Sequence, residues 1–590
     1  MKIKTFILSC LLAIIAIHAN AYDFTVDGID YAITSTTDLT VQVEKVEFGD
    51  DEFETTITIP STVVFNKKTY RVTGISGYAF RDLQYLVSVY MPSITYIESA
   101  DFYGDSDYYG VFSGCKNLKH VDMPSVITIG EYAFANTDIE SISLPVASSI
   151  GANAFYNSVI DSLCLPAVSA IGAKAFASSS IYSISLPAAI SISDSAFYHS
   201  RRLEYVNIPM AISIGKAAFS KCYLLRGVSM PAAKYIGDYA FQESSLSTKP
   251  EDLNMPAAIT IGKHAFEGSG IKIVSMPVAT SICDSAFKDC LLRSVSMPAV
   301  KQIGKSAFCC CYYLQSNLSL PAATFIGNNA FAYCSLKGLS LPAATFIGGG
   351  AFGRTALKSI SLPAATFIGD GAFNECLYLD SVNLPVAKSI GGWTFYHCDN
   401  LETVNMPKVT TIGDQAFMYC FYLKEIVMPS IKSIGMYAFS GCDYTSDYGN
   451  NAITDIFVGY EPASFPEWTS SYSPDDFFDE ETCYRATLHV PAGCASKYKA
   501  AIIWRNFHQI SEDYNPTGIK STVVDDMKIH TDNGSVQITG LKEGEKVEFY
   551  SISGQLLDAP IANGGTVSIK TSEHVVICKM GGASIKILVK

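Results

Sequence analysis

The sequence has little charge, few histidines and no motif of a known catalytic class. Charged residues make up 17% of the 590 residues, and the formal net charge is −14 at pH 7. Because nucleic acid is held chiefly by clustered Lys and Arg, this balance excludes DNA and RNA as main partners. The nine histidines are scattered, and no Gly-x-Ser-x-Gly, His-Glu-x-x-His, P-loop or dinucleotide-binding motif occurs. We therefore expect neither an enzyme nor a cofactor.

Long apolar runs are also missing, except at the start of the chain, where residues 6–17 follow a basic segment and precede small residues. This pattern predicts a signal peptide over residues 1–21, cleaved before Tyr22. A lipidated Cys10 is the alternative, although the apolar stretch before it is short. No later stretch reaches the roughly 18–20 uninterrupted apolar residues that a membrane helix needs. We expect a secreted or outer-surface protein that does not span the membrane.

What the sequence does have is a repeat. The phrase φ-x-φ-Pro-Ala-x-x-x-Ile-Gly-x-x-Ala-Phe-x-x-Cys-x-x-Leu, where φ is apolar, returns between residues 75 and 442. Its Phe recurs mostly every 21 or 22 residues, which predicts about 17 coils: Phe80, Phe112, Phe134, Phe155, Phe176, Phe197, Phe219, Phe241, Phe266, Phe287, Phe308, Phe331, Phe352, Phe373, Phe395, Phe417 and Phe439. A period of this length is typical of leucine-rich repeats, whose units bury their apolar faces against their neighbours. We expect these rings to stack inside a solenoid.

The residues before each Pro alternate, as in Ser359-Ile360-Ser361-Leu362, and such alternation marks a strand with one buried face. These strands are predicted to stack into one long parallel sheet. The Pro should end the strand, and the Gly of the Ile-Gly step should permit a tight turn. At about 4.8 Å per coil the solenoid would be on the order of 80 Å long. The predicted fold is mainly β.

The repeated phrase, together with the Ile-Pro-Ser-Thr-Val segment at residues 59–63, resembles the BspA-type leucine-rich-repeat proteins of anaerobic bacteria. The resemblance covers roughly residues 22–512. It implies a right-handed solenoid on a cell-surface or secreted protein that adheres to host matrix proteins, plasma proteins or other bacteria. The Pro-Ala-Ala or Pro-Ala-Val step departs from the family pattern, which bears on the shape of each coil but not on the fold.

Changes in pattern predict five segments. After the signal peptide we expect an N-terminal β cap (residues 22–74), the solenoid (75–445), its closing unit with a strand and a short helix (446–512), and a small β-sandwich (517–590), since a solenoid needs caps and the period is lost beyond the Pro-Thr-Gly junction. Short strands around Tyr550 and Ile585 resemble the sorting domain of type IX secretion substrates. That resemblance implies either an active sorting signal or an inactive relic.

The 17 cysteines raise the question of disulfides or zinc. Nine of them lie three residues after a repeat Phe and so form one column: Cys115, Cys222, Cys290, Cys311, Cys334, Cys376, Cys398, Cys420 and Cys442. We interpret the column as buried free thiols, which behave as small hydrophobes. Disulfides between neighbouring coils are the alternative, because export permits oxidation. The run Cys309-Cys310-Cys311 lacks zinc-ligand spacing and an accompanying His, so no metal is expected there.

Two inserts rich in Asp, Gly and Tyr interrupt the period, one at residues 101–110 and the other at 443–450. Neither fits an EF-hand loop, so solvated turns are favoured over calcium sites. Tyr is enriched in recognition surfaces because it offers rigid amphipathic area. The candidate ligand-binding side chains are therefore Tyr103, Tyr108, Tyr109, Tyr444 and Tyr448.

The residue two positions before each Pro should face outward, and this column is small, polar and nearly uncharged: Tyr90, Asp122, Ser143, Cys164, Ser185, Asn207, Ser229, Asn254, Ser275, Ser296, Ser319, Ser340, Ser361, Asn383, Asn405 and Val427. Either it merely keeps the sheet soluble, or it is a strip that hydrogen-bonds an extended protein or glycan. The leading hypothesis is an adhesin-like protein that binds extracellular proteins of the host or of bacteria. The alternative is a carbohydrate-binding accessory protein.

Overall fold

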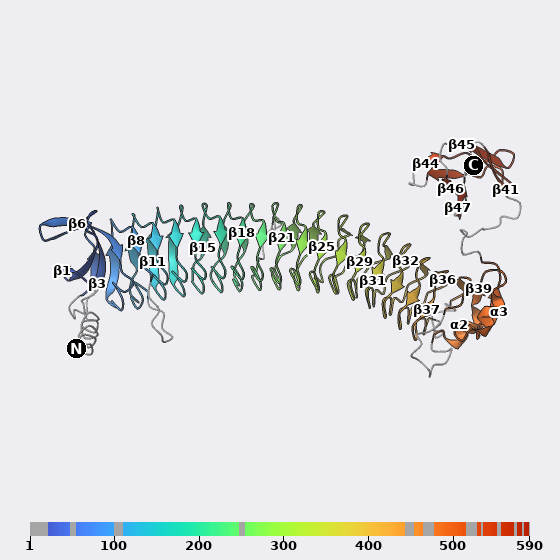
Figure 1. Cartoon of the computed structure of the whole chain (residues 1–590), viewed down its shortest axis with the longest axis horizontal. Helices are drawn as coiled ribbons and strands as arrows, with labels where there is room; N and C mark the ends of the chain where they lie inside the picture. Colours follow the sequence, from blue (N-terminus) through green and yellow to red (C-terminus); the bar gives the residue numbers. More distant parts are fainter. Residues whose placement is uncertain are drawn as a thin grey trace, which may run out of the picture.

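The computed structural model describes residues 22–47, 55–99, 110–246, 254–442, 453–463, 477–514, 528–532, 535–551, 556–571, 575–580 and 583–588. From the N-terminal strands to residue 514 the chain forms a gently curved β-solenoid of about 18 turns (Figure 1). The prediction of a mainly β solenoid is confirmed. The structure has about 18 turns, one more than the 17 coils predicted from the repeat Phe residues. No helix in the described part of the chain is long and apolar enough to cross a membrane.

One ladder of parallel strands is formed by the segments before each Pro, which we call the pre-proline ladder. It is divided into sheets of five, three, two, two and seven strands. Its strands are β4 (Thr55–Thr58), β7 (Leu86–Tyr90), β9 (His120–Asp122), β11 (Asp138–Ser143), β13 (Val159–Cys164), β15 (Ser183–Ser185), β17 (Tyr205–Asn207), β19 (Gly227–Ser229), β22 (Ile273–Ser275), β24 (Ser294–Ser296), β26 (Leu318–Ser319), β28 (Leu339–Ser340), β30 (Ser359–Ser361), β32 (Ser381–Asn383), β34 (Thr403–Asn405), β36 (Glu425–Met428), β38 (Asp455–Val458), β39 (Thr487–His489) and β40 (Gln509–Ser511).

A second ladder consists of two-residue strands. Each strand ends on the Ile that comes directly before the Gly position of the repeated phrase, and we call this the pre-glycine ladder. Twelve of its strands form one unbroken sheet, and the first four continue the sheet of the N-terminal strands. They are β8 (Tyr96–Ile97), β10 (Thr128–Ile129), β12 (Ser149–Ile150), β14 (Ala170–Ile171), β16 (Ser191–Ile192), β18 (Ser213–Ile214), β20 (Tyr235–Ile236), β21 (Thr260–Ile261), β23 (Ser281–Ile282), β25 (Gln302–Ile303), β27 (Phe325–Ile326), β29 (Phe346–Ile347), β31 (Phe367–Ile368), β33 (Ser389–Ile390), β35 (Thr411–Ile412) and β37 (Ser433–Ile434).

The two ladders correct one prediction, because the strands before the Pro do not make one long sheet. A tight turn does begin at the Gly of the Ile-Gly step, where Ala307 N donates to Gly304 O at 3.4 Å, but neither Gly304 nor Gly327 has a positive φ. The reason for Gly is space. Its N–H bonds the preceding coil, as Gly327 N does to Ile303 O at 2.8 Å, and a Cβ on Gly327 would lie 2.7 Å from the carbonyl carbon of Gly304. Left-handed residues instead flank most core Phe residues two positions away on both sides, as Ser306 and Cys310 do around Phe308.

The repeat Phe rings form the centre of the solenoid. All 17 are fully buried, and neighbouring rings stack with centroids 4.8–5.6 Å apart. Phe134, Phe155, Phe176, Phe352 and Phe373 all belong to this stack. Phe478 extends the stack beyond Phe439, with the two ring centroids 5.0 Å apart. Because the 21–22-residue period is interrupted between these two residues, this last turn could not be recognised in the sequence.

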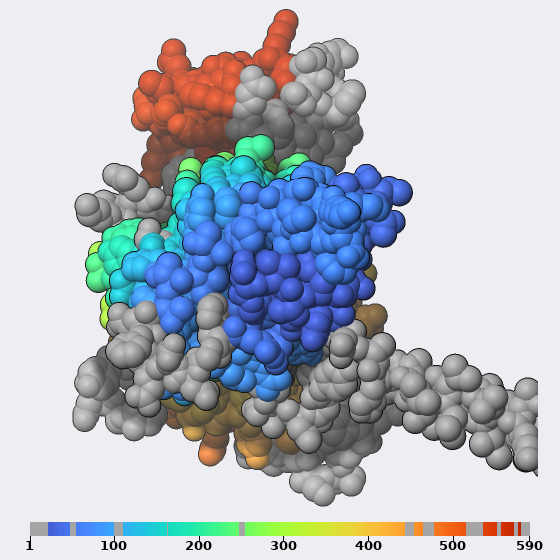
Figure 2. Space-filling model, turned by 90° about the vertical axis from the view of Figure 1, so that its left-hand side faces the viewer, coloured from blue at the N-terminus to red at the C-terminus, as the bar shows by residue number. Residues whose placement is uncertain are grey.

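The ends of the solenoid are covered. At the N-terminal end, which faces the viewer in Figure 2, β1 (Phe24–Val26), β2 (Ile29–Ser35) and β3 (Thr40–Val46) are antiparallel, and β5 (Thr62–Phe65) pairs with β6 (Lys68–Ile75). β3 pairs with β6 in parallel and so starts the solenoid direction. At the other end α2 (Glu480–Arg485) and α3 (Ala495–Ala500) accompany the buried Trp504, whose Nε1 donates to Ala463 O.

Beyond residue 527 the chain forms two further antiparallel sheets. One contains β41 (Lys528–Asp532), β42 (Ser535–Thr539) and β45 (Thr566–Lys570), and the other contains β43 (Glu548–Ser551), β44 (Leu556–Asp558), β46 (Val575–Met580) and β47 (Ala583–Leu588). Residues from both sheets, among them Val536, Phe549 and Cys578, share one buried cluster that is separate from the solenoid core. The β-sandwich expected for this region stays a prediction.

Candidate functional site

The predicted polar strip lies on the outer surface of the pre-proline ladder. Its residues are exposed or half-buried, and several are joined along the solenoid axis. Asn405 Nδ2 donates to Asn383 Oδ1 at 2.7 Å, and Asn383 Nδ2 donates to Ser361 Oγ at 3.2 Å. Asn207 and Ser185 repeat this contact at 3.1 Å. Each amide keeps a second N–H, so the strip can hydrogen-bond an extended partner.

Two shallow depressions lie along this strip. One, of about 490 Å³, is lined by residues of β15, β17 and β19, including Ser185, Tyr205 and Asn207. The other, of about 370 Å³, is lined by β32, β34 and β36, including Asn383 and Glu425. Their polar lining consists of hydroxyl and amide groups with a single carboxylate. This chemistry suits recognition through hydrogen bonds and provides no acid–base pair for catalysis.

A larger hollow of about 770 Å³ lies beside the N-terminal strands. It is lined by groups of both charges, among them Asp30, Glu44, Lys45 and Arg81. The buried Asp30 carboxylate accepts a hydrogen bond from Thr25 Oγ1 at 2.6 Å, so a neighbouring strand already satisfies it. We assign this hollow to the cap.

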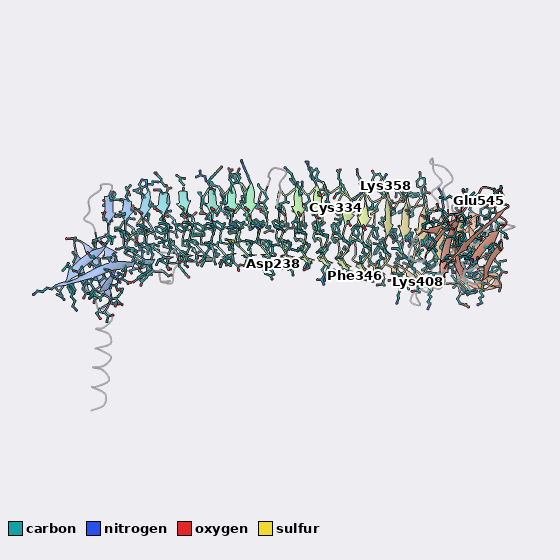
Figure 3. All side chains as sticks on the ribbon, turned by 90° about the horizontal axis from the view of Figure 1, so that it is seen from above. Asp238, Cys334, Phe346, Lys358, Lys408 and Glu545 are labelled. Carbon is teal, nitrogen blue, oxygen red and sulfur yellow. The ribbon has the colours of Figure 1, made fainter. Side chains whose placement is uncertain are left out.

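The opposite face carries residues that the sequence analysis did not single out. Phe325, Phe346 and Phe367 stand on the outer side of the pre-glycine ladder and stack at 4.8 Å with 7° between ring planes. Phe325 and Phe367 are 40% and 43% exposed. In Figure 3 Phe346 lies along one edge of the solenoid, and Lys358, which precedes β30, lies along the other. The available signal was Phe in three near-identical repeats where most other coils have Ser or Thr.

The cysteine column is packed inside the turn after each Phe. Its nine members are buried and not disulfide-bonded, and all nine donate from Sγ to the carbonyl of a Phe one coil back, as Cys115 does to Phe80 O at 2.9 Å. Burial raises the pKa of Cys115 and Cys222 to about 12 and that of Cys376 to about 11. Such thiols remain protonated and unreactive near neutral pH.

No metal site takes shape among the described residues, where no three His, Cys, Asp or Glu side chains are grouped to hold an ion. Cys309 and Cys310 come closest to a reactive pair, with sulfurs 3.5 Å apart and half-buried side chains. Burial and the neighbouring Cys310 raise the pKa of Cys309 to about 12, which disfavours the thiolate that metal binding needs.

A His between two carboxylates lies in the closing unit. His489 Nε2 is 2.9 Å from Asp455 Oδ1, its Nδ1 is 2.7 Å from Asp513 Oδ1, and its ring stacks on Phe457. Burial raises the pKa of Asp513, but hydrogen bonds from His489 and Ser511 outweigh it, so that pKa lies below its usual value. These contacts tie neighbouring strands together at the solenoid end.

The predicted tyrosine sites, Tyr103, Tyr108, Tyr109, Tyr444 and Tyr448, lie outside the described residues. They stay predictions.

Family comparison agrees with the repeat architecture. The protein-family model described as "BspA type Leucine rich repeat region (6 copies)" matches residues 108–187, 148–251, 234–353 and 345–457. These matches together cover more than half of the chain. The protein therefore belongs to the BspA-type leucine-rich-repeat family.

Among solved structures, similar chains are also leucine-rich-repeat proteins. A leucine-rich repeat protein from Bacteroides ovatus is 23% identical, with 75% of this chain and 99% of that chain covered and a TM-score of 0.40. A leucine rich cell surface protein from Faecalibacterium prausnitzii is 20% identical, with 84% and 99% covered and a TM-score of 0.23. The pneumococcal vaccine antigen PcpA is 16% identical, with 83% and 98% covered and a TM-score of 0.22. No curated protein matches the chain.

Proposed function

We propose that this chain is an exported or surface-displayed, adhesin-like protein that binds host or bacterial proteins through its solenoid. The observation that carries the proposal is the pair of exposed side-chain faces that run along most of a solenoid of about 18 turns. A repeated surface of this kind can engage a partner at many points at once. Membership of the BspA-type family supports the same class of function. We expect no catalytic activity.

Export and display rest on the two ends of the chain. The predicted signal peptide, residues 1–21, would direct export, and the predicted β-sandwich, residues 517–590, would address the protein to the outer surface. The separate buried cluster of residues 536–578 supports an independently packed unit at the C-terminal end. We retain the cap, solenoid and closing-unit boundaries at residues 22–74, 75–445 and 446–512 as part of this proposal.

The binding proposal is tested with residues 22–590 immobilised and exposed in parallel to arrays of extracellular proteins and of glycans. We expect saturable binding to at least one protein that the heat-unfolded chain does not show. Absence of saturable protein binding would contradict the proposal. Binding to glycans alone would favour a carbohydrate-binding accessory protein, for which the hydroxyl- and amide-lined depressions beside Tyr205 and Asn383 are the supporting observation.

The sorting proposal is tested by deleting residues 517–590 and measuring how much protein reaches the cell surface. We expect the truncated chain to be retained within the envelope, while the melting temperature of its solenoid changes little because repeat contacts are local. Normal surface amounts would show that this region is not a sorting signal. Loss of ligand by the purified truncated protein would instead move the binding site to the C-terminal region.

A further inference from the structure

The outer surface of the pre-glycine ladder has an unusual charge composition for so acidic a protein. Three columns form this surface, which we call the pre-glycine face: the residue after each Pro from Pro92 to Pro429, and the two residues before each buried Ile. None of these positions holds Asp or Glu. The face carries five lysines: Lys234, Lys301, Lys388, Lys408 and Lys432. The surface is therefore basic on a chain whose formal charge is −14.

The row bordering this face, directly after the Gly position, does contain aspartates. Asp238 Oδ1 and Asp284 Oδ1 each accept the backbone N–H of the next coil, from Lys263 at 2.7 Å and from Lys305 at 2.8 Å. The side chains of Lys263 and Lys305 alternate with these carboxylates along the row. Over the whole row six acidic residues outnumber three lysines, so the border is acidic and offsets part, but not all, of the five positive charges of the face: Glu131, Asp194, Asp238, Asp284, Asp370 and Asp414 against Lys216, Lys263 and Lys305. Beside the three exposed Phe rings the row holds one acid, Asp370, whose Oδ1 accepts the backbone N–H of Gly392 at 2.9 Å.

The face also exposes large apolar side chains, which soluble surfaces gather chiefly where they bind. Ile190 and Met210 are 57% and 59% exposed, and the stack of Phe325, Phe346 and Phe367 lies several coils further on. Aromatic rings held rigidly by their neighbours lose little conformational entropy on binding, which is why such side chains dominate binding energy. The Phe stack is the strongest candidate centre on the face.

The surroundings of the stack make it an amphipathic site. Lys301 lies one coil before Phe325 and Lys388 one coil after Phe367, and both side chains are exposed. No salt bridge joins either ammonium to a carboxylate in the part of the chain that the structure describes. Thr324, Thr345 and Thr366 run beside the rings, with hydroxyls that donate to carbonyls of the preceding coil. This apolar centre has a cationic group at each end.

We propose that the pre-glycine face, centred on Phe325, Phe346 and Phe367, binds a protein segment whose apolar centre is flanked by carboxylates. Charge complementarity argues for this partner, because both ends of the ring stack offer Lys and the face holds no acid. Three rings bordered by Thr and Gln are too small an apolar area for a bilayer, and five lysines along the whole face, beside an acidic row, are too sparse for nucleic acid. The inference rests on the proposed protein-binding function and assigns it to one face.

The test uses a random peptide library displayed on phage and panned against the full chain. Enriched peptides are synthesised, and their affinity is measured for the wild-type protein and two variants. The first variant replaces Phe325, Phe346 and Phe367 by Ser, the residue that Ser191, Ser213 and Ser389 supply at this position in other coils. The second replaces Tyr313 and Tyr378, exposed aromatic residues outside both faces, by Ser and serves as the matched control. Circular dichroism checks that all three proteins unfold at similar temperatures.

We expect enriched peptides with acidic residues on both sides of an apolar centre. The triple Phe variant should bind them at least about tenfold more weakly, and the variant with Tyr313 and Tyr378 replaced should bind unchanged. Lys301→Gln combined with Lys388→Gln should weaken binding about threefold and reduce its salt dependence. Enriched peptides that bind the triple variant as tightly as wild type, or that lack acidic residues, would overturn this inference while leaving the proposed function intact.

Failure of the broader proposal looks different. If no peptide is enriched and the array of extracellular proteins also gives no saturable binding, the protein-binding function itself is contradicted. Vesicles of phosphatidylglycerol and phosphatidylcholine form a further arm of the experiment. Sedimentation with these vesicles that depends on the three Phe residues would overturn the peptide partner in favour of a lipid surface.

Discussion

The two faces of the solenoid are built by strands that recur at the same period, yet they differ in backbone continuity and in chemistry. The pre-proline ladder has strands of two to six residues and breaks into five sheets, whereas two-residue strands keep twelve coils of the pre-glycine ladder in one sheet. Its surface is a strip of Ser and Asn, while the pre-glycine face exposes Ile, Phe and Lys.

The difference shows that close approach of neighbouring coils, more than strand length, determines where this solenoid keeps its hydrogen bonds continuous. A Cβ on Gly348 or Gly304 would lie 2.6 Å from backbone nitrogen of the preceding coil. On the pre-proline side, a Cβ on Gly227 would meet only the ring of Tyr205 at 3.4 Å. At its glycine positions the pre-glycine side is therefore packed to backbone contact from coil to coil, and we expect this contact to make it the more rigid support for outward side chains.

The largest predicted effect separates a buried ring from an exposed one in the same coil. Phe352→Ala should destabilise the solenoid by about 3–5 kcal/mol, because it leaves a cavity in the core stack that both ladders share. Phe346→Ala, six residues earlier, should cost less than about 1 kcal/mol because its ring packs only on exposed neighbours. Urea unfolding of both variants measures the difference. Equal losses would mean that the outer stack supports the fold rather than offering a binding surface.

The next prediction tests the close approach directly. Gly304→Ala should destabilise by about 2–3 kcal/mol, since its Cβ would clash with the backbone of Asp284 and Cys283. Gly227→Ala should be neutral or stabilise by up to about 1 kcal/mol, because Ala restricts the unfolded chain and meets no backbone here. Hydrogen exchange read coil by coil shows where each change acts. If Gly304→Ala were as harmless as Gly227→Ala, space would not be what the pre-glycine ladder needs.

The sequence predicted what repeats with a clear period and missed what does not. The Phe column and the alternation of Ser359-Ile360-Ser361 are strong signals, because each places an apolar side chain at a fixed interval. A two-residue strand such as β27 is too short to show alternation, so the pre-glycine ladder could not be predicted. The Ile-Gly step was correctly predicted to precede a tight turn, but its Gly is needed for the close approach of the neighbouring coil and not for a positive φ. The sequence does not distinguish these two reasons for Gly.

The candidate site divides in the same way. The outward strip of Ser361 and Asn383 followed from counting residues back from each Pro, and its exposure could be predicted. Phe346 was missed because an aromatic residue inside an apolar repeat is usually part of the core. Left-handed backbone at Trp393 was hidden for a related reason, because a tryptophan does not signal a positive φ.

Alkaline pH acts on the interior that both faces share. Burial raises the pKa of Cys376 to about 11, above the value of about 8.5 for an exposed thiol, so the folded state holds its proton more tightly. The stabilisation is complete below about pH 8.5 and is lost as the pH rises through about 11, at up to about 1.4 kcal/mol per pH unit for each such thiol. Urea midpoints measured from pH 8 to 11 should fall for wild type.

The matched variant replaces Cys376, Cys398 and Cys420 by Ala. It should be less stable at pH 8, but its midpoint should fall less steeply with pH because three of the raised thiol pKa values are gone. Tyr and Lys titrate equally in both proteins, so the difference in slope isolates the thiols. Identical slopes would be inconsistent with protonated thiols in the core and would favour disulfides between neighbouring coils.

The smallest predicted effect compares one hydrogen bond from each side. Asn383 bonds only exposed side chains, Ser361 and Asn405, so water can replace its partners and Asn383→Ala should cost at most about 0.5 kcal/mol. Asp284 accepts the backbone N–H of Lys305 at 2.8 Å on the pre-glycine side, and Asp284→Ala should cost about 1 kcal/mol because it removes a bond that links two coils. Thermal unfolding of the two variants gives the ranking. The reverse order would place the rigid support beneath the Ser and Asn strip and would make that strip, rather than the pre-glycine face, the better ordered surface for a partner.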